Sequence, residues 1–140
     1  MRAKVPQEVF EFRSGGETIL LVEDDPALRK MAAEVLRDTG YKVLTAPSGI
    51  DAMQIAAEHS GPLDILLTDV VMPGMTGREL ADQIVARYPR TQVLYMSGYT
   101  DDAIGHHGLH DQALRLLQKP FTHDALVRRV REAIEAGARA

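Results

Sequence analysis

The sequence contains no cysteine among its 140 residues. A disulfide scaffold, a thiolate zinc or iron–sulfur centre and a cysteine nucleophile are therefore excluded. No apolar run approaches the ~18 residues that cross a bilayer, and the N-terminus lacks the apolar core of a signal peptide. These absences predict a cytoplasmic protein that makes no membrane contact.

An excess of basic residues is also missing. Twenty Asp and Glu residues outnumber sixteen Lys and Arg residues, which gives a net charge of −4. Because nucleic-acid binding favours a basic face, the composition predicts no nucleic-acid partner. A hydrophobic content of 45% excludes disorder throughout the chain, and 140 residues suffice for one domain with its own core.

The first 17 residues differ from the rest of the chain. They contain a proline and a Gly-Gly pair and show no helical periodicity. We expect an N-terminal arm or linker over residues 1–17 and a single domain over residues 18–140. A short edge strand through Val9 and Phe12 is the alternative for part of this arm.

Five short apolar runs alternate with segments of helical periodicity. Runs of this length without polar alternation are typical of strands buried on both faces of a parallel sheet. The predicted strands cover residues 19–22, 43–45, 65–68, 93–96 and 114–117. The predicted helices cover residues 26–39, 48–58, 77–88 and 122–136, and residues 100–112 carry a weaker helical pattern with two glycines and three histidines. Pro26 and Ser48 favour helix starts at their positions.

This order of elements is (βα)5. Connections between parallel strands are right-handed, so the pattern predicts an α/β fold with a doubly wound, five-stranded parallel sheet. Functional sites in such folds lie at the carboxyl ends of the strands. Polar residues directly follow four of the predicted strands: Glu23, Asp24 and Asp25 after the first, Asp69 after the third, Ser97 after the fourth, and Lys119 after the fifth.

Carboxylates, a hydroxyl and an ammonium at one edge of a sheet form a specific set. Clustered carboxylates repel one another, so they bind a hard divalent cation or shift their pKa values upward. Mg²⁺ suits a site of a few carboxylates, retained waters and phosphate oxygens. Asp69 can attack phosphorus to form an acyl phosphate, while Lys119 and the Ser97 hydroxyl contact phosphoryl oxygens.

Other phosphate-handling folds fit the sequence less well. A haloacid-dehalogenase-type phosphatase needs a second Asp two residues after its nucleophile, and this chain has Val71 there. A flavodoxin needs a hydroxyl- and glycine-rich loop after the first strand, where Glu23 and Asp24 would repel phosphate. Neither a Walker loop nor a GxGxxG motif is present.

Four stretches together carry a family resemblance: ILLVEDDPALRK, LLTDVVMPGMTGREL, VLYMSGYT and LQKPF. With them the chain resembles the CheY-like receiver domains of response regulators over residues 18 to 136. The resemblance implies a flavodoxin-like, CheY-like fold in which Asp69 is the phosphoacceptor. It implies Mg²⁺, with Mn²⁺ as a substitute, and a ligand set of Glu23, Asp24, Asp69 and the backbone carbonyl of Val71.

The same resemblance implies roles for two further residues. Ser97 becomes the switch hydroxyl, and Lys119 becomes the phosphoryl-binding lysine in a cis bond to Pro120. The family's aromatic switch position is Leu116 here, so no aromatic ring can rotate inward at this point. We expect Asp25 to cap the helix that follows it.

As a receiver domain, the chain would take a phosphoryl group from a histidine kinase or a histidine phosphotransfer protein. It would catalyse its own phosphorylation and dephosphorylation, without independent substrate turnover, and act as a switch or a phosphorelay intermediate. The run MSGYTDD…HHG…LQKPF is most similar to receivers of hybrid histidine kinases. Because little chain follows the last helix, we expect no fused output domain.

Two interpretations remain open beside this one. A degenerate receiver that serves only as a protein-binding module is the alternative, which the intact acidic set disfavours. The three histidines between residues 100 and 112 could in principle bind a metal or donate a phosphoryl group. Their glycine-interrupted surroundings favour solvent-exposed side chains instead.

Overall fold

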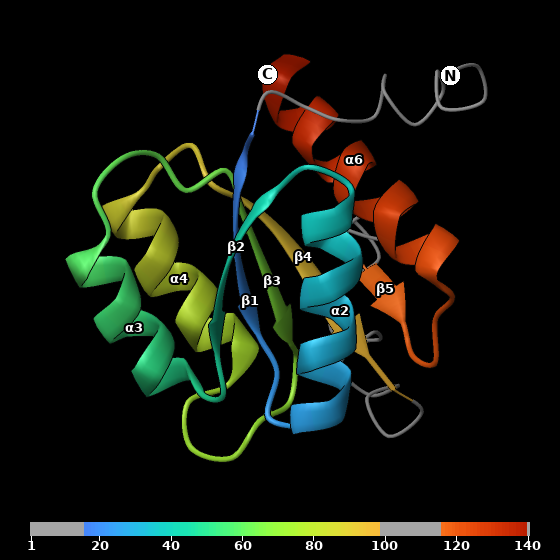
Figure 1. The fold of residues 1–140 in the computed structure, drawn as a ribbon. Coiled ribbons are helices and arrows are strands. Elements are labelled where there is room, and N and C mark those ends of the chain that lie inside the picture. The colour runs from blue at the N-terminus through green and yellow to red at the C-terminus, as the bar shows by residue number, and fades with distance from the viewer. Residues whose placement is uncertain (1–15, 99–115, 140) are drawn as a thin grey trace.

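The computed structural model describes residues 16–98 and 116–139 of the chain. These residues form one five-stranded sheet with helices on both sides (Figure 1). In chain order the elements are β1 (Thr18–Val22), α2 (Pro26–Asp38), β2 (Lys42–Ala46), α3 (Gly49–Glu58), β3 (Ile65–Asp69), α4 (Gly77–Arg87), β4 (Gln92–Ser97), β5 (Leu116–Gln118) and α6 (His123–Arg139). No helix in this described part is long and apolar enough to cross a membrane.

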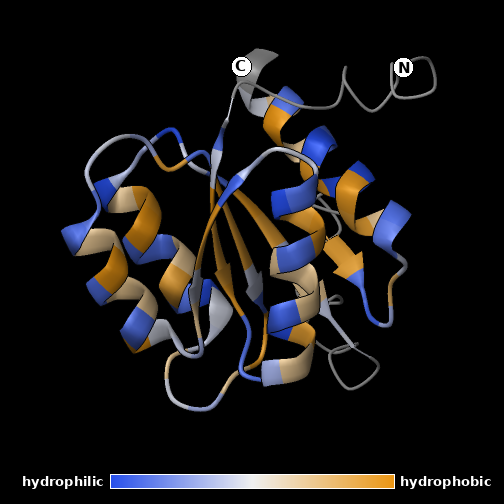
Figure 2. Cartoon of the chain, viewed as in Figure 1, coloured by the Kyte–Doolittle hydropathy of each residue, from blue (hydrophilic) through white to orange (hydrophobic). Residues whose placement is uncertain are grey.

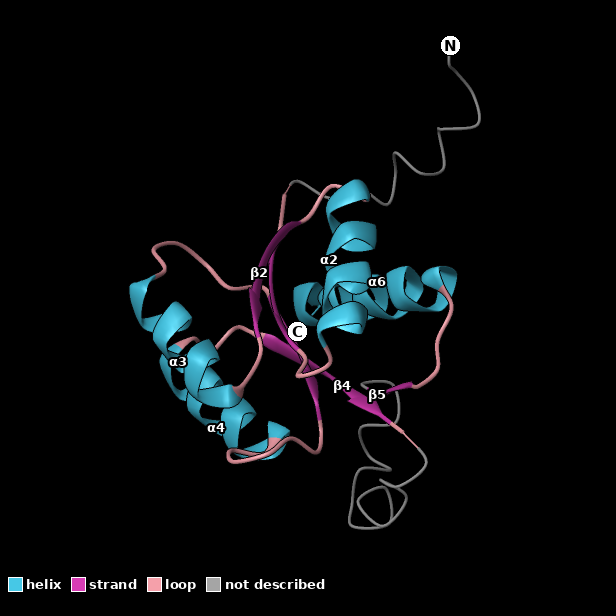
Figure 3. Cartoon of the chain, turned by 60° about the horizontal axis from the view of Figure 1, so that its bottom comes forward, coloured by secondary structure: helices cyan, strands magenta, loops and turns pink. Residues whose placement is uncertain are grey.

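All neighbouring strands are parallel, and their order is β2-β1-β3-β4-β5. Helices α2 and α6 cover one face of the sheet, and α3 and α4 cover the other (Figures 1 and 3). This arrangement confirms the predicted α/β fold with a doubly wound parallel sheet. The chain leaves β1 toward β2 on one side and resumes with β3 on the other. The switch point, where such sheets place their ligands, therefore lies between β1 and β3.

Two apolar layers hold the helices against the sheet. Side chains alternate across a strand, so Ile19 and Leu21 face α2 and α6, whereas Leu20 and Val22 face α3 and α4. Every residue of β1 and of β3 is buried, which is why their sequences show no alternation of apolar and polar residues. Figure 2 shows these apolar strands between helices that carry both hydrophobic and hydrophilic residues.

Three helices begin with side-chain caps that follow the carboxyl ends of strands. Asp25 caps α2 by accepting hydrogen bonds from two backbone amides, and Ser48 caps α3, both as predicted. Thr76 and Glu79 form a reciprocal capping box at the start of α4. These caps fix the points at which the loops after β1, β2 and β3 enter their helices.

Some predictions differ from the structure or lie outside it. Helix α4 ends at Arg87, one residue before the predicted end, because Tyr88 caps it and donates a 2.6 Å hydrogen bond from its hydroxyl to Ala56 O. The weakly patterned segment 100–112 with its three histidines lies outside the described residues. So do residues 1–15 of the predicted arm, and the expectations for both segments stay predictions.

Gly77 determines how closely α4 approaches the end of β3. Its amide donates a 2.9 Å hydrogen bond to Val70 O, and a Cβ atom at this position would overlap the backbone carbonyl of Asp69. The obstructing atoms belong to the backbone, so they cannot move aside as the end of a flexible side chain could. The first residue of α4 therefore packs directly against the backbone of Asp69.

Replacing Gly77 with alanine is expected to lower the free energy of unfolding by about 3 kcal/mol, because the added methyl group must displace the backbone of β3. Chemical denaturation measures this change. Gly98→Ala is the matched control, since no atom of residues 16–98 and 116–139, the chain neighbours aside, lies within 4 Å of a Cβ atom at this position. Its unfolding free energy should stay within about 0.5 kcal/mol of wild type. Equal losses in the two variants would contradict the steric explanation.

Candidate functional site

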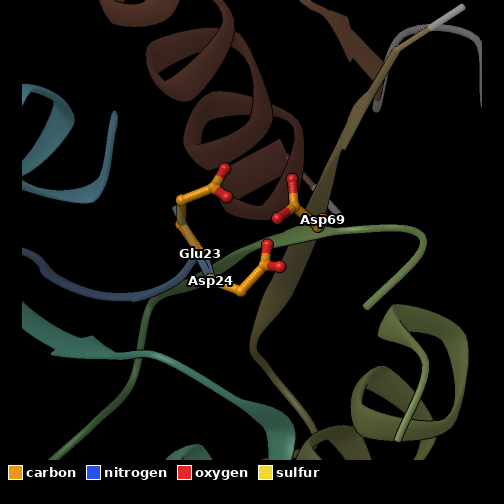
Figure 4. A group of neighbouring side chains, drawn as sticks. All are labelled: Glu23, Asp24 and Asp69. Atoms are coloured by element: carbon orange, nitrogen blue, oxygen red, sulfur yellow. The ribbon is translucent and has the colours of Figure 1, made fainter. Parts of the chain in front are cut away.

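Three carboxylates meet at the carboxyl ends of β1 and β3. Glu23 and Asp24 directly follow β1, and Asp69 is the last residue of β3, the neighbouring strand. Each residue offers one oxygen atom to a group whose members lie within 4.8 Å of one another (Figure 4). Glu23 and Asp69 are buried, with exposed fractions of 1% and 3%, whereas Asp24 is exposed. The fold thus brings together the three carboxylates that were predicted at strand ends.

Lys119 places its ammonium between two of these carboxylates. Its Nζ atom lies 2.6 Å from Asp69 Oδ1 and 2.9 Å from Glu23 Oε1. The lysine directly follows β5, and its backbone amide donates a 2.7 Å hydrogen bond to Ser97 O at the end of β4. Its peptide bond to Pro120 is cis, as the family resemblance implied. The ammonium therefore reaches Asp69 from the β5 side of the sheet, and the acidic pair reaches it from the β1 side.

Burial and charge crowding dominate the electrostatics of Asp69. Burial, followed by the neighbouring Glu23 carboxylate, raises the pKa of Asp69 to about 8 despite the opposing effect of Lys119. The pKa of Lys119 is also raised: burial alone would lower it, but the attraction of Asp69 and Glu23 outweighs that effect. One ammonium thus compensates only part of the negative charge that the fold gathers here.

The carboxylate oxygens suit a hard cation. Apart from the ion pairs with Lys119, no group in the described residues donates a hydrogen bond to Glu23 Oε1 or to either Asp69 oxygen, all of which are buried. Among these residues, no ammonium or guanidinium forms an ion pair with Asp69 Oδ2. Mg²⁺ binds such oxygens while keeping several waters, and the exposed Asp24 leaves one side of the site open to water. The acidic cluster is therefore compatible with a divalent metal.

Hydrogen bonds hold the loop that carries Glu23 and Asp24. Arg29 Nη1 donates a 2.8 Å hydrogen bond to Glu23 O, and the Asp25 amide donates to Glu23 Oε2 at 2.9 Å. The Glu23 amide in turn donates to Ala46 O at the end of β2. Sequence reasoning missed Arg29, because a helical arginine gives no signal of which carbonyl it reaches. Its only unusual feature is a positive charge near a helix N-terminus, where a cation is disfavoured.

Ser97 and Val71 are close to Asp69 by their positions at the end of β4 and just after β3. Ser97 ends β4 one residue beyond Met96, which pairs with Asp69, and its hydroxyl donates to Gly98 O at 3.4 Å. Val71 follows Asp69 by two residues, and its side chain is 54% exposed. The proposed roles of the Ser97 hydroxyl and of the Val71 carbonyl stay predictions.

Leu116 occupies the position at which the family resemblance places an aromatic residue. It begins β5, pairs with Tyr95 of β4, and packs half-buried against the apolar layer beneath α3 and α4. An aliphatic side chain in this layer has no ring to rotate between two positions. Any response to chemistry at Asp69 must therefore use other contacts.

Comparisons with known proteins agree with this geometry. The family model described as "Response regulator receiver domain" matches residues 19–131. The chain is 38% identical over 122 residues to the sensor kinase CckA of Brucella abortus, covering 87% of this chain and 13% of that protein. It is 31% identical over 118 residues to the response regulator receiver protein CpdR of the same bacterium, covering 84% of this chain and 97% of that protein.

A solved structure gives the same picture. The receiver domain from the hybrid histidine kinase CckA is 33% identical, with a TM-score of 0.67, and the match covers 84% of this chain and 98% of that chain. The predicted similarity to receivers, those of hybrid kinases included, is confirmed. The chain spans less than a third of the length of several curated relatives that it matches.

Metal-free protein should lose stability as the pH rises toward 8. In the unfolded chain Asp69 ionises near its ordinary pKa of 3.8, whereas the folded protein keeps the proton until about pH 8. The unfolded state therefore binds fewer protons between these values, and the free energy of unfolding falls across this window. Denaturation in EDTA at several pH values within the window measures the slope.

Asp69→Asn should be more stable than wild type in EDTA at neutral pH, by on the order of 1 kcal/mol or more, and should lose much of this pH slope. Asp82→Asn, which alters an exposed carboxylate of α4, is the control and should keep the wild-type slope. The charge-crowding account fails if Asp69→Asn is less stable than wild type in EDTA and keeps the wild-type slope.

Proposed function

This chain belongs to the response regulator receiver domain family, and we propose that it takes a phosphoryl group from a phosphohistidine protein onto Asp69 in a Mg²⁺-dependent reaction. One observation carries the proposal: the Lys119 ammonium lies 2.6 Å from Asp69 within a cluster of three carboxylates. A phosphoryl group bound together with a cation would balance the charges of this cluster. Mn²⁺ is expected to substitute, because it also accepts carboxylate ligands.

The proposed transfer forms one bond and breaks one. An ionised oxygen of Asp69 attacks phosphorus while the P–N bond to the partner's imidazole breaks, and that bond's electron pair stays on the imidazole nitrogen. In the product, Lys119 and the Ser97 hydroxyl contact the phosphoryl oxygens and stabilise their charge. Hydrolysis follows as a separate step, in which a water oxygen attacks phosphorus, the P–O bond to Asp69 breaks, and inorganic phosphate and the Asp69 carboxylate are released.

The ligands proposed for the cation are Glu23, Asp24, Asp69 and the backbone carbonyl of Val71. When bound, Mg²⁺ would supply positive charge to the phosphoryl oxygens during transfer. Asp24 is the exposed member, so it offers a ligand that can exchange with water. Because Asp69 is itself one of the two buried ligands, a cation held here would contact the nucleophilic carboxylate.

The ionisation state of Asp69 decides when the site can react. Its pKa of about 8 leaves much of the metal-free population protonated, and a protonated carboxyl is a poor nucleophile at neutral pH. A bound cation and the Lys119 ammonium both favour the ionised form. Cation binding and nucleophilicity therefore depend on the same carboxylate.

Backbone contacts offer a route from the site to the rest of the domain. Because the Lys119 amide donates to Ser97 O, contacts of both side chains with a phosphoryl group would act on the ends of β4 and β5 together. The start of α6 follows Lys119 by a few residues and would respond with them. With Leu116 at the aromatic position, we propose that this response depends on Lys119 and Ser97 alone.

We propose a histidine kinase or a histidine phosphotransfer protein as the partner. The domain would act in the cytoplasm as a phosphorylation switch or a phosphorelay intermediate, and its net charge of −4 argues against a nucleic-acid partner. Similarity to the CckA receiver and to CpdR supports this class of partner. A receiver that serves only as a binding module is the competing class, and the retained Asp69, Lys119 and Glu23 disfavour it.

Asp69→Asn should abolish phosphorylation. Treatment of wild type with acetyl phosphate and Mg²⁺ should add one phosphoryl group, seen in the intact mass, because Asp69 alone is both the carboxylate that ends β3 and an ion-pair partner of Lys119. Asp64→Asn is the matched control, since this carboxylate lies before the opposite end of β3 and accepts a hydrogen bond from the Thr18 amide. Full labelling of Asp69→Asn, or none of wild type, would rule out the assignment.

Lys119→Ala should slow phosphorylation by roughly a hundredfold, the usual effect of removing one group that stabilises developing charge. Its Mg²⁺ affinity should be equal to that of wild type or higher, because an ammonium repels a cation. Calorimetric titration and phosphorylation rates test the two effects separately. Lys42→Ala, which removes an exposed lysine of β2, should leave both unchanged. A loss of Mg²⁺ binding together with an unchanged phosphorylation rate would contradict the role proposed for Lys119.

A further inference from the structure

Arg29 contacts the acidic site through the backbone rather than through a carboxylate. Its Nη1 atom donates a 2.8 Å hydrogen bond to Glu23 O. We propose that Arg29 is a positioning residue, which holds the Glu23–Asp24 peptide and thereby keeps the Asp24 carboxylate in place for a divalent cation. This inference rests on the proposed metal-dependent function and concerns how its cation site is shaped.

The place of Arg29 in α2 is unfavourable by helix electrostatics alone. Its amide donates to the carbonyl of the N-cap residue Asp25, so it lies at the positive end of the helix dipole. Helical side chains tilt toward the N-terminus, and this one reaches back beyond the cap to Glu23 O. A charged donor makes a stronger hydrogen bond than a neutral one. The contact with the carbonyl therefore explains an arginine here better than helix propensity does.

The two acidic residues of the loop are held by different means. Glu23 is buried, and its carboxylate contacts the Lys119 ammonium and accepts a hydrogen bond from the Asp25 amide. Asp24 is exposed, and within residues 16–98 and 116–139 no group donates a hydrogen bond to its carboxylate. The backbone, which sets the direction of the Cα–Cβ bond of Asp24, is therefore what limits where this carboxylate can reach. Because a peptide group is planar, fixing Glu23 O also fixes the plane from which the Asp24 backbone continues.

Removal of Arg29 distinguishes positioning from simple electrostatics by the sign of the effect. A guanidinium near the carboxylates repels an approaching cation, so loss of the charge alone would tighten Mg²⁺ binding. Loss of a positioning contact would weaken Mg²⁺ binding, because residues that orient metal ligands typically contribute about tenfold or more in affinity. The direction of the change in affinity therefore decides between the two roles.

The experiment compares Arg29→Met with Arg37→Met in calorimetric titrations with Mg²⁺. Arg37 is the matched control, because it lies on the same helix and its Nη2 atom donates a 2.9 Å hydrogen bond to a backbone carbonyl, Val43 O. Val43 pairs with Ile19, near the end of β1 that is remote from the acidic cluster. We expect roughly tenfold weaker Mg²⁺ binding for Arg29→Met, no change for Arg37→Met, and an intermediate affinity for Arg29→Lys, which keeps a charged hydrogen-bond donor.

Two readouts separate positioning from a general loss of structure. In EDTA, amide hydrogen exchange at Asp25, whose N–H donates to Glu23 Oε2, should be faster in Arg29→Met than in Arg37→Met. Phosphorylation of Arg29→Met by acetyl phosphate should be slow at low Mg²⁺ and should return to the wild-type rate at saturating Mg²⁺. Melting curves establish that each variant folds. If Arg29→Met does not fold, the affinity of Arg29→Lys decides the question.

Equal or tighter Mg²⁺ binding by Arg29→Met would overturn the positioning role, and so would an equal loss of affinity in Arg37→Met. A phosphorylation rate that stays low at saturating Mg²⁺ would also overturn it, because the defect would then lie beyond the cation site. Wild-type protein that binds no Mg²⁺ would instead overturn the proposed function itself.

Discussion

Lys119 lies between two carboxylates that the fold buries together, and the proposed chemistry depends on this pair of contacts. Glu23 and Asp69 are adjacent because β1 and β3 are parallel neighbours whose carboxyl ends share one edge. Burying an ammonium with two carboxylates gives little stability by itself, since desolvation offsets the attraction. The apolar layers on both faces of the sheet therefore stabilise the arrangement, and the proposed function would explain why the destabilising acidic cluster is present.

Helix caps and backbone contacts around the cluster hold its carboxylates in defined positions. The caps at Asp25 and Thr76 fix the loops after β1 and β3, and Gly77 lets α4 begin against the backbone of Asp69. Arg29 adds a contact to the loop between β1 and α2. Pre-organised carboxylates bind a cation without first paying the entropy of ordering the loops. The burial that makes Asp69 hard to ionise would also make its ionisation responsive to a bound cation.

The sequence predicted the sheet well, because strands buried on both faces leave uninterrupted apolar runs such as the one at Ile65. Strand-end positions then predicted that Glu23, Asp69 and Lys119 would share an edge. The contacts of Arg29 and the clash that excludes a side chain at Gly77 depend on three-dimensional paths that no periodicity encodes. The capping box at Thr76 corresponds to the sequence Thr-Gly-Arg-Glu, but this pattern indicates only a helix start and not a functional residue at a strand end.

Chemical trapping of the phosphorylated residue shows which carboxylate accepts the phosphoryl group. Borohydride reduces an acyl phosphate to an alcohol, so it marks the phosphorylated carboxylate permanently, and peptide mass spectrometry then locates the mark. After incubation with acetyl phosphate and Mg²⁺, this account predicts reduction at Asp69 alone, and none when EDTA replaces Mg²⁺. Reduction at Glu23, Asp24 or another carboxylate, or equal reduction of Asp69 in EDTA, would contradict a cation-dependent phosphoacceptor at the end of β3.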